Sequence, residues 1–415
     1  MSLVSDLLSR VVRVAGRPLP HRLLAALPFG ILVAAAPSCI ARQVLPAIEH
    51  RVVYHDTKEF AGWPANEGMW AWGDELLVGF EVARYTEVDK DHSIDRSSPK
   101  RITFARSLDG GRTWLAEEHP EIAPPEYIGD AARYRQESST AAAPQPSPGN
   151  FDFSHPDFAM KIRGGTFYVS FNRGREWSGP YLLPDFGGIP ESRTNYLVTG
   201  PNTCLIFGNS RVVVGKVKYT RSCVFRTDDG GKTFQFVSWI GDDIAGDYQR
   251  ERTMRGEIVD GGEEVFSIMP SAVQIGDRYV VSLRQRVGRM KWTDIYASAD
   301  GCRTWKKLSR LENGSSNPAA LVALGGEKLA AIYGNRRGGK TPLGVSAKLS
   351  EDGGRTWSKE IMLRSDARKW DLGYTRAVRR ADGTIIAAYY YTTEAVPQNF
   401  IAATLWRPTT GETKN

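Results

Sequence analysis

Cysteine is scarce in this chain, because only four of its 415 residues are cysteines. Cys39 lies in the N-terminal segment, which leaves Cys204, Cys223 and Cys302 for the rest of the chain. An odd number of cysteines argues against a disulfide scaffold. One bridge between Cys204 and Cys223 can still form, but nothing in the sequence requires it.

Basic clusters, long amphipathic helical patterns and metal-ligand spacings are also lacking. Lys and Arg exceed Asp and Glu by 54 to 47, but the resulting net charge of +7 is spread along the chain. Without a basic stripe or a recognisable binding motif, nucleic acid is not expected as a partner. No cluster of His, Cys and Asp has the spacing of metal ligands, so neither a metal nor another cofactor is expected.

Glycine, proline and aromatic residues are abundant by contrast. The chain has 41 Gly and 23 Pro, together with 11 Trp, 16 Tyr and 16 Phe. Glycine supplies positive φ angles in tight turns, and aromatic side chains pack well on the pleated surface of a sheet. This composition favours many short strands joined by tight turns, and therefore an all-β fold.

The N-terminus has the pattern of a targeting segment. Four arginines come first: Arg10, Arg13, Arg17 and Arg22. The apolar stretch Leu23–Ala36 and a group of small residues follow, which predicts a signal peptide over residues 1–41 or, because the basic part is long, an uncleaved anchor. A lipid anchor at Cys39 is less favoured, since the residues before it make a poor lipoprotein signal. We expect residues 42–415 to form one exported domain, periplasmic or secreted.

An eight-residue motif recurs along this domain. Ser107–Trp114 reads SLDGGRTW and Ser350–Trp357 reads SEDGGRTW, with close variants at Thr227–Phe234 and Ser298–Trp305 and a degenerate copy at Ser170–Trp177. The aspartate can accept backbone N–H groups in a turn, glycine takes a positive φ angle, and tryptophan packs against a sheet. Each copy therefore predicts one β-hairpin.

Apolar segments precede most copies of the motif and repeat with them. The clear ones are Gly73–Phe80, Arg211–Val214, Tyr279–Leu283, Leu329–Tyr333 and Ile385–Tyr391. With Phe158–Phe171 they give about six units spaced by roughly 50 to 70 residues, which is typical of propeller blades of four strands. We predict a β-propeller with six blades, seven being the alternative. Ring closure should pair Arg51–Tyr54 with Phe400–Trp406, because a closed ring leaves no unpaired edge. Two polar segments, Glu117–Asn150 and Gly241–Glu264, are predicted insertions.

The repeated motif resembles the Asp-box (BNR) repeat of the sialidase superfamily, and the resemblance covers the chain from about Val52 onward. Sialidases hold the substrate carboxylate with three arginines, attack with a tyrosine that a glutamate activates, and use an aspartate as acid/base catalyst. Guanidinium groups suit the first task, because they pair bidentately with a carboxylate and stay charged. The resemblance places the second arginine at Arg284 and the third at Arg336 or Arg337. The first falls at Gly62 and is absent.

The attacking tyrosine of the family corresponds to Tyr374, in the segment Asp371–Arg376. The glutamate that would activate it falls at Met269 or Pro270 and is also absent. Because an unactivated tyrosine is a weak nucleophile near neutral pH, these two losses argue against conventional sialic-acid hydrolysis. Arg376 shares the segment of Tyr374 and is a further candidate for binding the substrate.

Candidates for the acid/base group lie in loops. Asp91 and His92 follow the first inner strand, together with Asp89, and His155 lies in the loop that enters the second unit. Sialidase-like propellers also resemble families that act on uronic-acid polysaccharides as rhamnosidases or lyases, and those families rely on histidine, tyrosine and arginine. Glu67 stands beside two tryptophans, where it is either a substrate ligand at the mouth of the cavity or an ordinary turn residue.

These residues predict an exo-acting glycosidase for an acidic, carboxylate-bearing sugar of a glycan or polysaccharide. Arg284 and Arg336 would bind the anion, and Tyr374 would stand at the reacting centre. One alternative is a lyase that cleaves uronic-acid polysaccharides by β-elimination in the same pocket. The other is a non-catalytic propeller that binds carbohydrate or protein, because a fold by itself does not fix a function.

Overall fold

The structure is a computed structural model, which describes residues 48–123, 142–186, 188–214, 217–255, 265–315, 317–339 and 341–408. The chain divides into two units, Met1–Val44 and Leu45–Asn415, and all described residues belong to the second. The predicted signal or anchor segment, residues 1–41 with Cys39, therefore lies outside the described residues. Among the described residues, no helix is both long enough and apolar enough to cross a membrane.

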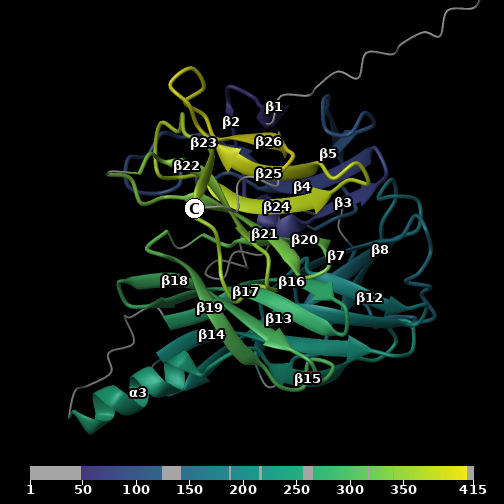
Figure 1. Cartoon of the computed structure of the whole chain (residues 1–415). Coiled ribbons are helices and arrows are strands. Elements are labelled where there is room, and N and C mark those ends of the chain that lie inside the picture. The colour runs from purple at the N-terminus through teal and green to yellow at the C-terminus, as the bar shows by residue number, and fades with distance from the viewer. Residues whose placement is uncertain are drawn as a thin grey trace, which may run out of the picture. The chain divides into compact units, whose positions relative to one another are not determined.

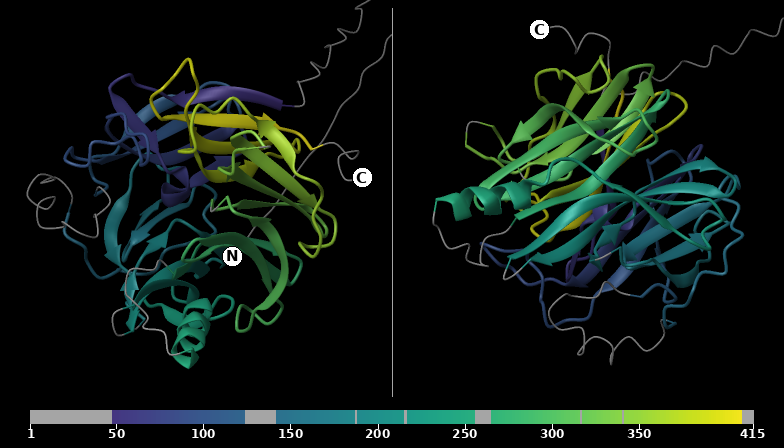
Figure 2. Two further views of the ribbon diagram at one scale, coloured as in Figure 1. Left: turned by 90° about the vertical axis from the view of Figure 1, so that its left-hand side faces the viewer. Right: turned by 90° about the horizontal axis from the view of Figure 1, so that it is seen from below.

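The described strands of the unit Leu45–Asn415 form five sheets that follow one another around a common centre (Figure 1 and Figure 2). The first contains β2 (Glu59–Gly62), β3 (Met69–Trp72), β4 (Glu75–Arg84), β5 (Arg101–Ser107) and β6 (Leu115–Glu118). The short helix α1 (Pro64–Glu67) lies between β2 and β3, which both pair with β4. The second sheet contains β11 (Ser192–Arg193), β7 (Ala159–Gly164), β8 (Thr166–Ser170) and β9 (Ser178–Leu182).

The third sheet is the largest and contains two antiparallel halves. The first half has β10 (Ile189–Pro190), β12 (Tyr196–Gly200), β13 (Thr203–Val214), β14 (Val217–Thr227) and β15 (Gln235–Trp239). The second half has β16 (Val265–Ile275), β17 (Arg278–Val287), β18 (Met290–Ser298) and β19 (Lys306–Asn313). A parallel pairing of β14 with β16 joins the halves. The polar segment between them, which the sequence predicts only as an insertion, contains the helix α3 (Ile244–Met254).

The last two sheets complete the all-β architecture. The fourth contains β20 (Ala320–Gly325), β21 (Lys328–Asn335), β22 (Gly344–Ser350) and β23 (Ile361–Arg364). The fifth contains β24 (Gly373–Arg379), β25 (Ile385–Tyr391), β26 (Phe400–Trp406) and β1 (Ile48–Tyr54). The pairing of β1 with β26 brings Val52 opposite Ala402, so the predicted closure between the two ends of the chain is confirmed. The number of blades stays a prediction, because the strands pair into five sheets.

The middle strands of the sheets are buried on both faces. β25 reads IIAAYYY, and every residue of β25 and of β26 is buried. Such continuous apolar runs are expected where neighbouring sheets cover both faces of a strand. One core cluster, for example, packs Phe60 and Leu76 of the first sheet against Ile386 and Ile401 of the fifth. The edge strand β6 is largely exposed by contrast.

The repeated motif forms hairpin turns, as predicted. In the first copy, Ser107 Oγ accepts the N–H of Gly111 at 2.8 Å and donates to Asp109 Oδ1 at 2.8 Å. Asp109 Oδ1 also accepts the backbone N–H groups of Arg112 and Thr113 at 3.0 and 2.9 Å. The other copies join β8 to β9, β14 to β15, β18 to β19 and β22 to β23.

The three cysteines of this unit are buried thiols. Cys204 lies on β13 opposite Thr227, and Cys223 lies on β14 opposite Gly208, so the two are not cross-strand partners. Both are free, as is Cys302. The bridge that the sequence left open does not form here, and burial raises the pKa of the Cys223 and Cys302 thiols to about 12.

Candidate active site

Tyr374 lies at the start of β24 in an unusual backbone conformation. Its φ angle is 49°, in the left-handed region that residues other than glycine rarely adopt. Asn317 holds this turn, because its Oδ1 accepts the Tyr374 N–H at 2.8 Å and its Nδ2 donates to the carbonyl of Leu372 at 3.2 Å. The intervening Gly373 is so close to Asn317 that a Cβ atom would lie 2.5 Å from Oδ1. The surroundings thus fix the direction of the Tyr374 side chain, as is common at functional sites.

Two predicted arginines meet at this tyrosine. Arg284 of β17 donates a hydrogen bond from Nη1 to the Tyr374 hydroxyl at 2.9 Å. Arg336, directly after β21, lies over the same ring, with Cζ 5.5 Å from its centroid, and its Nε donates to the Leu372 carbonyl at 2.9 Å. Three different sheets therefore contribute to one cluster, as the sequence predicts for Arg284, Arg336 and Tyr374. Their roles in binding or catalysis stay predictions.

The arginines change the acidity of the Tyr374 hydroxyl. Burial by itself raises the pKa of a phenol, because it disfavours the charged form. Here the positive charges of Arg284, Arg336 and Arg193, with the hydrogen bond from Arg284, outweigh burial and lower the pKa of Tyr374 below its ordinary value of 10.0. Tyr374 is thus more acidic than a free tyrosine, although no carboxylate stands at the position of the family's glutamate.

His92 and Asp371 form a second part of the site. His92 Nδ1 and Asp371 Oδ1 are 2.6 Å apart, and the carboxylate is fully buried while 23% of the imidazole is exposed. The His92 ring also packs edge-on against Trp63, with 5.1 Å between ring centroids. Burial raises the pKa of Asp371, but the hydrogen bond and charge of His92 and the charge of Arg336 outweigh it and lower that pKa. An ionised Asp371 therefore orients a partly exposed histidine.

Tyr390 connects the two parts. Its hydroxyl donates to Asp371 Oδ1 at 2.6 Å and accepts a hydrogen bond from Arg336 Nη2 at 2.6 Å. The rings of Tyr390 and Tyr374 pack edge to face, with 6.0 Å between centroids. Burial raises the pKa of Tyr390 well above 10.0, so this hydroxyl stays neutral and can donate to the carboxylate. The network runs without a break from His92 to Arg336 and reaches the ring of Tyr374.

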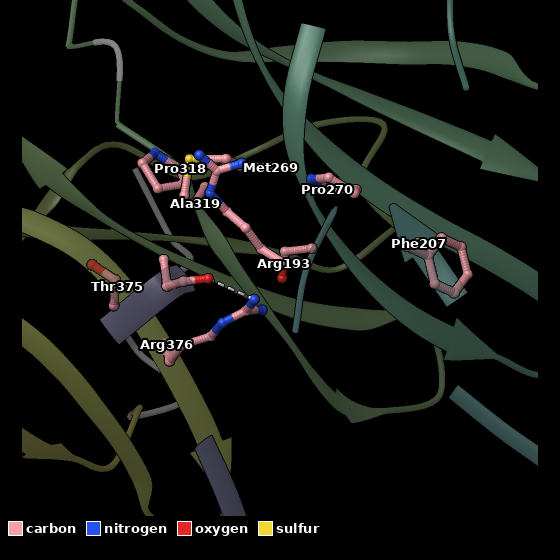
Figure 3. A pocket seen from close by; sticks show the side chains of 10 residues that line it. Arg193, Phe207, Met269, Pro270, Pro318, Ala319, Thr375 and Arg376 are labelled. Atoms are coloured by element: carbon pink, nitrogen blue, oxygen red, sulfur yellow. Dashed lines mark hydrogen bonds between the residues drawn. The ribbon is translucent and has the colours of Figure 1, made fainter. Parts of the chain in front are cut away.

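Thr375 and Arg376, the two residues that follow Tyr374 in the chain, line a narrow pocket (Figure 3). Arg193 of β11 and Arg376 of β24 line it together with apolar side chains such as Phe207 and Met269. Arg376 donates to the carbonyl of Ala65 at 2.8 Å and to that of Thr194. The predicted candidate Arg376 thus lies at the same centre as Tyr374.

Glu67 occupies a different environment from the cavity mouth that the sequence allowed. It is fully buried at the end of α1, where Lys161 Nζ contacts its Oε2 at 2.5 Å and Arg163 Nη1 lies 3.0 Å from its Oε1. Both carboxylate oxygens therefore face cations of β7. This arrangement corrects the prediction that Glu67 binds substrate, because breaking such a buried ion pair is costly and the carboxylate is not exposed.

Asp91 and His155 also lie outside the cluster. Asp91 caps the N–H of His92 at 2.8 Å and pairs with the exposed Arg96 at 2.5 Å, so it shapes the loop that carries His92. His155 packs edge-on against Phe171 of the degenerate repeat and accepts the N–H of Asp157 at 3.2 Å. Local structure accounts for the positions of both side chains, and whether Asp91 or His155 takes part in catalysis stays a prediction.

The cluster contains residues that the sequence patterns did not reveal. Arg193 lies in the two-residue strand β11, which is too short to show an apolar pattern from which the strand could be predicted. Asn317 and Tyr390 act only through contacts with distant segments. For Asp371 a signal was present, since it stands three residues before Tyr374, but its partner His92 lies on another sheet's loop. Among the described residues, no group of His, Cys, Asp and Glu could hold a metal ion, and the expectation that no cofactor is needed stays a prediction.

An all-β ring of Asp-box hairpins with aromatic and arginine side chains at its centre defines a β-propeller of the sialidase-like class. The profile of the BNR repeat-like domain family matches residues 154–387, which is more than half of the chain. The chain belongs to this family, and the predicted resemblance is confirmed. No curated protein matches the chain in a sequence comparison.

Solved structures of similar proteins agree with this fold. A protein of unknown function from Dyadobacter fermentans has a TM-score of 0.60 and 18% identity, with 87% of this chain and 99% of that chain covered. The endosialidase of phage phi92 has a TM-score of 0.50 and 9% identity, covering 89% and 70%. An α-L-arabinanase of Penicillium chrysogenum, complexed with arabinobiose, has a TM-score of 0.48 and 10% identity, covering 87% and 98%. At these identities the likeness to the first two structures shows the fold alone.

Proposed function

We propose that the chain is an exo-acting glycosidase for a terminal sugar that bears a carboxylate. The observation that carries this proposal is the Tyr374 hydroxyl, which accepts a hydrogen bond from Arg284 and has a lowered pKa despite its burial. A nucleophile can be activated by a lowered pKa as well as by a neighbouring base. The arginines thus take over a task that a glutamate performs in sialidases. Glycosidase folds among the similar structures are compatible with this function.

The same arginines are suited to the substrate's carboxylate. Arg284 and Arg336 both lie over the Tyr374 ring, so an anion that they bind is held next to the reacting oxygen. Fork-shaped guanidinium groups give bidentate pairing with a carboxylate and fix its orientation. Binding and attack would therefore occur around one side chain, with the anomeric carbon held near the Tyr374 oxygen.

His92 is the best candidate for the proton transfers. Asp371 holds Nδ1 at 2.6 Å, which sets the tautomer and leaves Nε2 for a substrate oxygen or a water molecule. Nε2 would protonate the leaving oxygen in the first step and take a proton from water in the second. Asp371 acts through His92 and is a positioning residue.

A uronate lyase is the second candidate, and the acidity of Tyr374 favours it as well. In that reaction a Tyr374 phenolate would remove the C5 proton, the C4–O bond would break, and a C4–C5 double bond would form while His92 protonates the departing oxygen. An arginine would neutralise the uronate. The site contains every group that this step needs, so products must separate the two reactions.

The decisive experiment compares products. The full chain is incubated with sialosides, rhamnosyl-uronides and ulvan-like polysaccharides, and with a neutral arabinan as contrast, while reducing ends and near-ultraviolet absorbance are followed. New reducing ends without absorbance support the hydrolase, and absorbance from an unsaturated uronic acid supports the lyase. No product from any acidic substrate would overturn both and leave a binding module. Export of the domain, predicted from residues 1–41, is a further proposal that suits a glycan outside the cytoplasm.

A further inference from the structure

Among the described residues, the pocket that Thr375 and Arg376 line contains two arginines and no acidic side chain. Arg193 and Arg376 reach it from β11 and β24, on different sheets (Figure 3). Its remaining walls are mostly apolar and include Phe207, Met269 and Pro318. Walls of low polarity screen charge poorly, so two cations that line the same pocket repel more strongly than they would in water.

The partners of both arginines are neutral oxygens. Arg193 donates to Asn66 Oδ1 at 2.7 Å and to the carbonyl of Glu191 at 3.1 Å. Arg376 donates to two backbone carbonyls, and its Nε is buried without a hydrogen-bond partner among the described residues, as is Thr375 Oγ1. Neither arginine forms an ion pair with a described carboxylate. A buried charge left in this state is costly unless something else supplies the opposite charge.

Nearby carboxylates are already occupied. Glu67 faces Lys161 and Arg163, and Glu81 faces Arg163 at 2.9 Å. Burial, and then repulsion from Arg193, lowers the pKa of Arg376 to about 10. Burial is the larger cause of this shift, and the charge of Arg193 adds to it, so each of these two arginines lies within the field of the other cation.

We propose that Arg193 and Arg376 form a second anion subsite, so that the substrate carries two acidic groups close together. This inference rests on the proposed function and adds the class of substrate. Tyr374 and Arg376 are two residues apart, so their Cα atoms are at most about 7 Å apart. An anion between Arg193 and Arg376 is therefore on the same sugar as the carboxylate bound at Arg284 or on its neighbour. A sulfate ester and a second carboxylate share the required chemistry, namely an oxyanion that accepts from guanidinium forks.

Binding of inorganic sulfate tests the subsite without any turnover. Isothermal titration of the full chain is carried out at constant ionic strength, with chloride as the replaced anion. We expect Arg376→Gln to remove one sulfate per chain or to weaken its binding by about 10- to 100-fold, the loss of a charged hydrogen-bonding partner. Arg376→Lys should retain intermediate binding, because it keeps the charge and loses the fork. Arg112→Gln, at an exposed arginine of the first repeat, is the matched control and should leave the titration unchanged.

Turnover then identifies the source of the second anion. Three oligosaccharides are compared, each with one terminal carboxylate and with a sulfate ester, a second carboxylate or no charge on the adjoining sugar. The ratio of kcat/KM for a doubly charged to the singly charged substrate should exceed about 10 and should fall toward one in Arg376→Gln. The doubly charged substrate that shows this ratio identifies the second anion as a sulfate ester or as a carboxylate.

The two proposals fail in different ways. If no oligosaccharide is turned over but sulfate binding still depends on Arg376, the glycosidase proposal fails and the subsite stands. If sulfate binding to Arg376→Gln equals that of the unaltered chain and the kcat/KM ratio stays near one throughout, the subsite is overturned even where the enzyme is active. Circular dichroism of Arg376→Gln and Arg376→Lys confirms that each variant folds before either result is used.

Discussion

Polar side chains find their hydrogen-bond partners nearby in the sequence at the hairpin turns, but in distant segments at the centre of the propeller. In the first Asp box, the carboxylate of Asp109 receives its hydrogen bonds from Ser107, Arg112 and Thr113, all within four residues. At the centre, Tyr374 accepts a hydrogen bond from Arg284, and the guanidinium group of Arg336 lies over its ring. Both arginines come from other sheets. The turns are thus local units, whereas the central cluster exists only when the ring has closed.

This difference predicts that the two regions respond to mutation in different ways. Removing a partner from a turn costs stability, because backbone N–H groups lose their acceptor. Removing a member of the central cluster should cost activity first, because the other members remain held by their own sheets. The following changes test that separation, in order of decreasing effect.

Tyr374→Phe should have the largest effect. It removes the hydroxyl that Arg284 contacts and leaves the ring against Tyr390. We expect kcat to fall by about 10⁶-fold, the scale for loss of a nucleophile, while the thermal midpoint changes little. Steady-state kinetics and calorimetry measure the two quantities. Retention of more than a tenth of the activity would show that Tyr374 is not at the reacting centre.

Asp371→Asn should lower activity by about 10²-fold, within the range for loss of acid/base assistance. Because the amide keeps the shape but not the charge, His92 loses the partner that fixes its tautomer. A double-mutant cycle separates this effect from a structural one, because in a His92→Gln background the same substitution should cost little further kcat if Asp371 acts through His92. An equal loss of kcat in both backgrounds would point to damage in packing instead.

Arg284→Gln should reduce kcat/KM by about 10- to 100-fold and raise the pKa of Tyr374. The charge of Arg284 is one of those that hold this pKa below 10.0, so its removal favours the protonated phenol. Ultraviolet titration of phenolate, taken as the difference between each protein and its Tyr374→Phe counterpart, follows this one residue. A difference titration identical in both backgrounds would contradict the assignment.

Asp352→Ala should act on stability alone. In the last Asp box this carboxylate accepts the backbone N–H groups of Arg355 and Thr356 at 3.0 and 2.9 Å, much as a helix-capping side chain does. Loss of such a group costs about 1–2 kcal/mol. Denaturant unfolding measures the change, and activity per folded molecule should stay the same. A fall in kcat would show that the turns and the centre are coupled.

Asp109→Asn should have the smallest effect at neutral pH and a distinct pH dependence. Hydrogen bonds in the turn outweigh burial and lower the pKa of Asp109 to about 2, below an unfolded value of about 3.9. The ionised carboxylate therefore contributes stability above about pH 4, and that contribution is lost as the pH falls through about 2.

The degenerate repeat makes this substitution conservative, because Asn172 already accepts the N–H groups of Arg175 and Glu176 at the equivalent position. Unfolding midpoints at pH 7 and pH 3 should differ less in Asp109→Asn than in the unaltered chain. If the midpoints of both proteins differ by the same amount between pH 7 and pH 3, Asp109 does not contribute to the loss of stability in acid.

Much of the fold could be predicted because the motif that forms each hairpin is repeated along the chain and makes its hydrogen bonds within a few residues. Each Asp box carries its own acceptor and donors, so eight residues suffice to define a hairpin. The closing pair of β1 and β26 followed from the need to leave no free edge. Arg284, Arg336 and Tyr374 could be found because the family pattern ties them to strands that are themselves recognisable. The helix α3 was missed because a polar helix in an insertion has no apolar period.

The candidates that lie outside the Tyr374 cluster show what local reasoning lacks. Asp91 and His155 have the right chemistry, but the folded chain gives them neighbours such as Arg96 and Phe171 instead of the centre. Glu67 forms an ion pair with Lys161, which is 94 residues away in the sequence, and no motif spacing predicts this contact. Arg193 lies in a strand of two residues, and it is recognised as part of the cluster only because its charge lowers the pKa of Tyr374.

The sequence by itself determined the ring of hairpins, because each turn is satisfied by hydrogen bonds within one short segment. Only the tertiary structure decided which ionisable groups share the centre. A pKa depends on charges a few ångströms away in space, and those charges come from strands that are distant in the chain. The acidity of Tyr374 and the lowered pKa of Arg376 are therefore properties of the closed propeller.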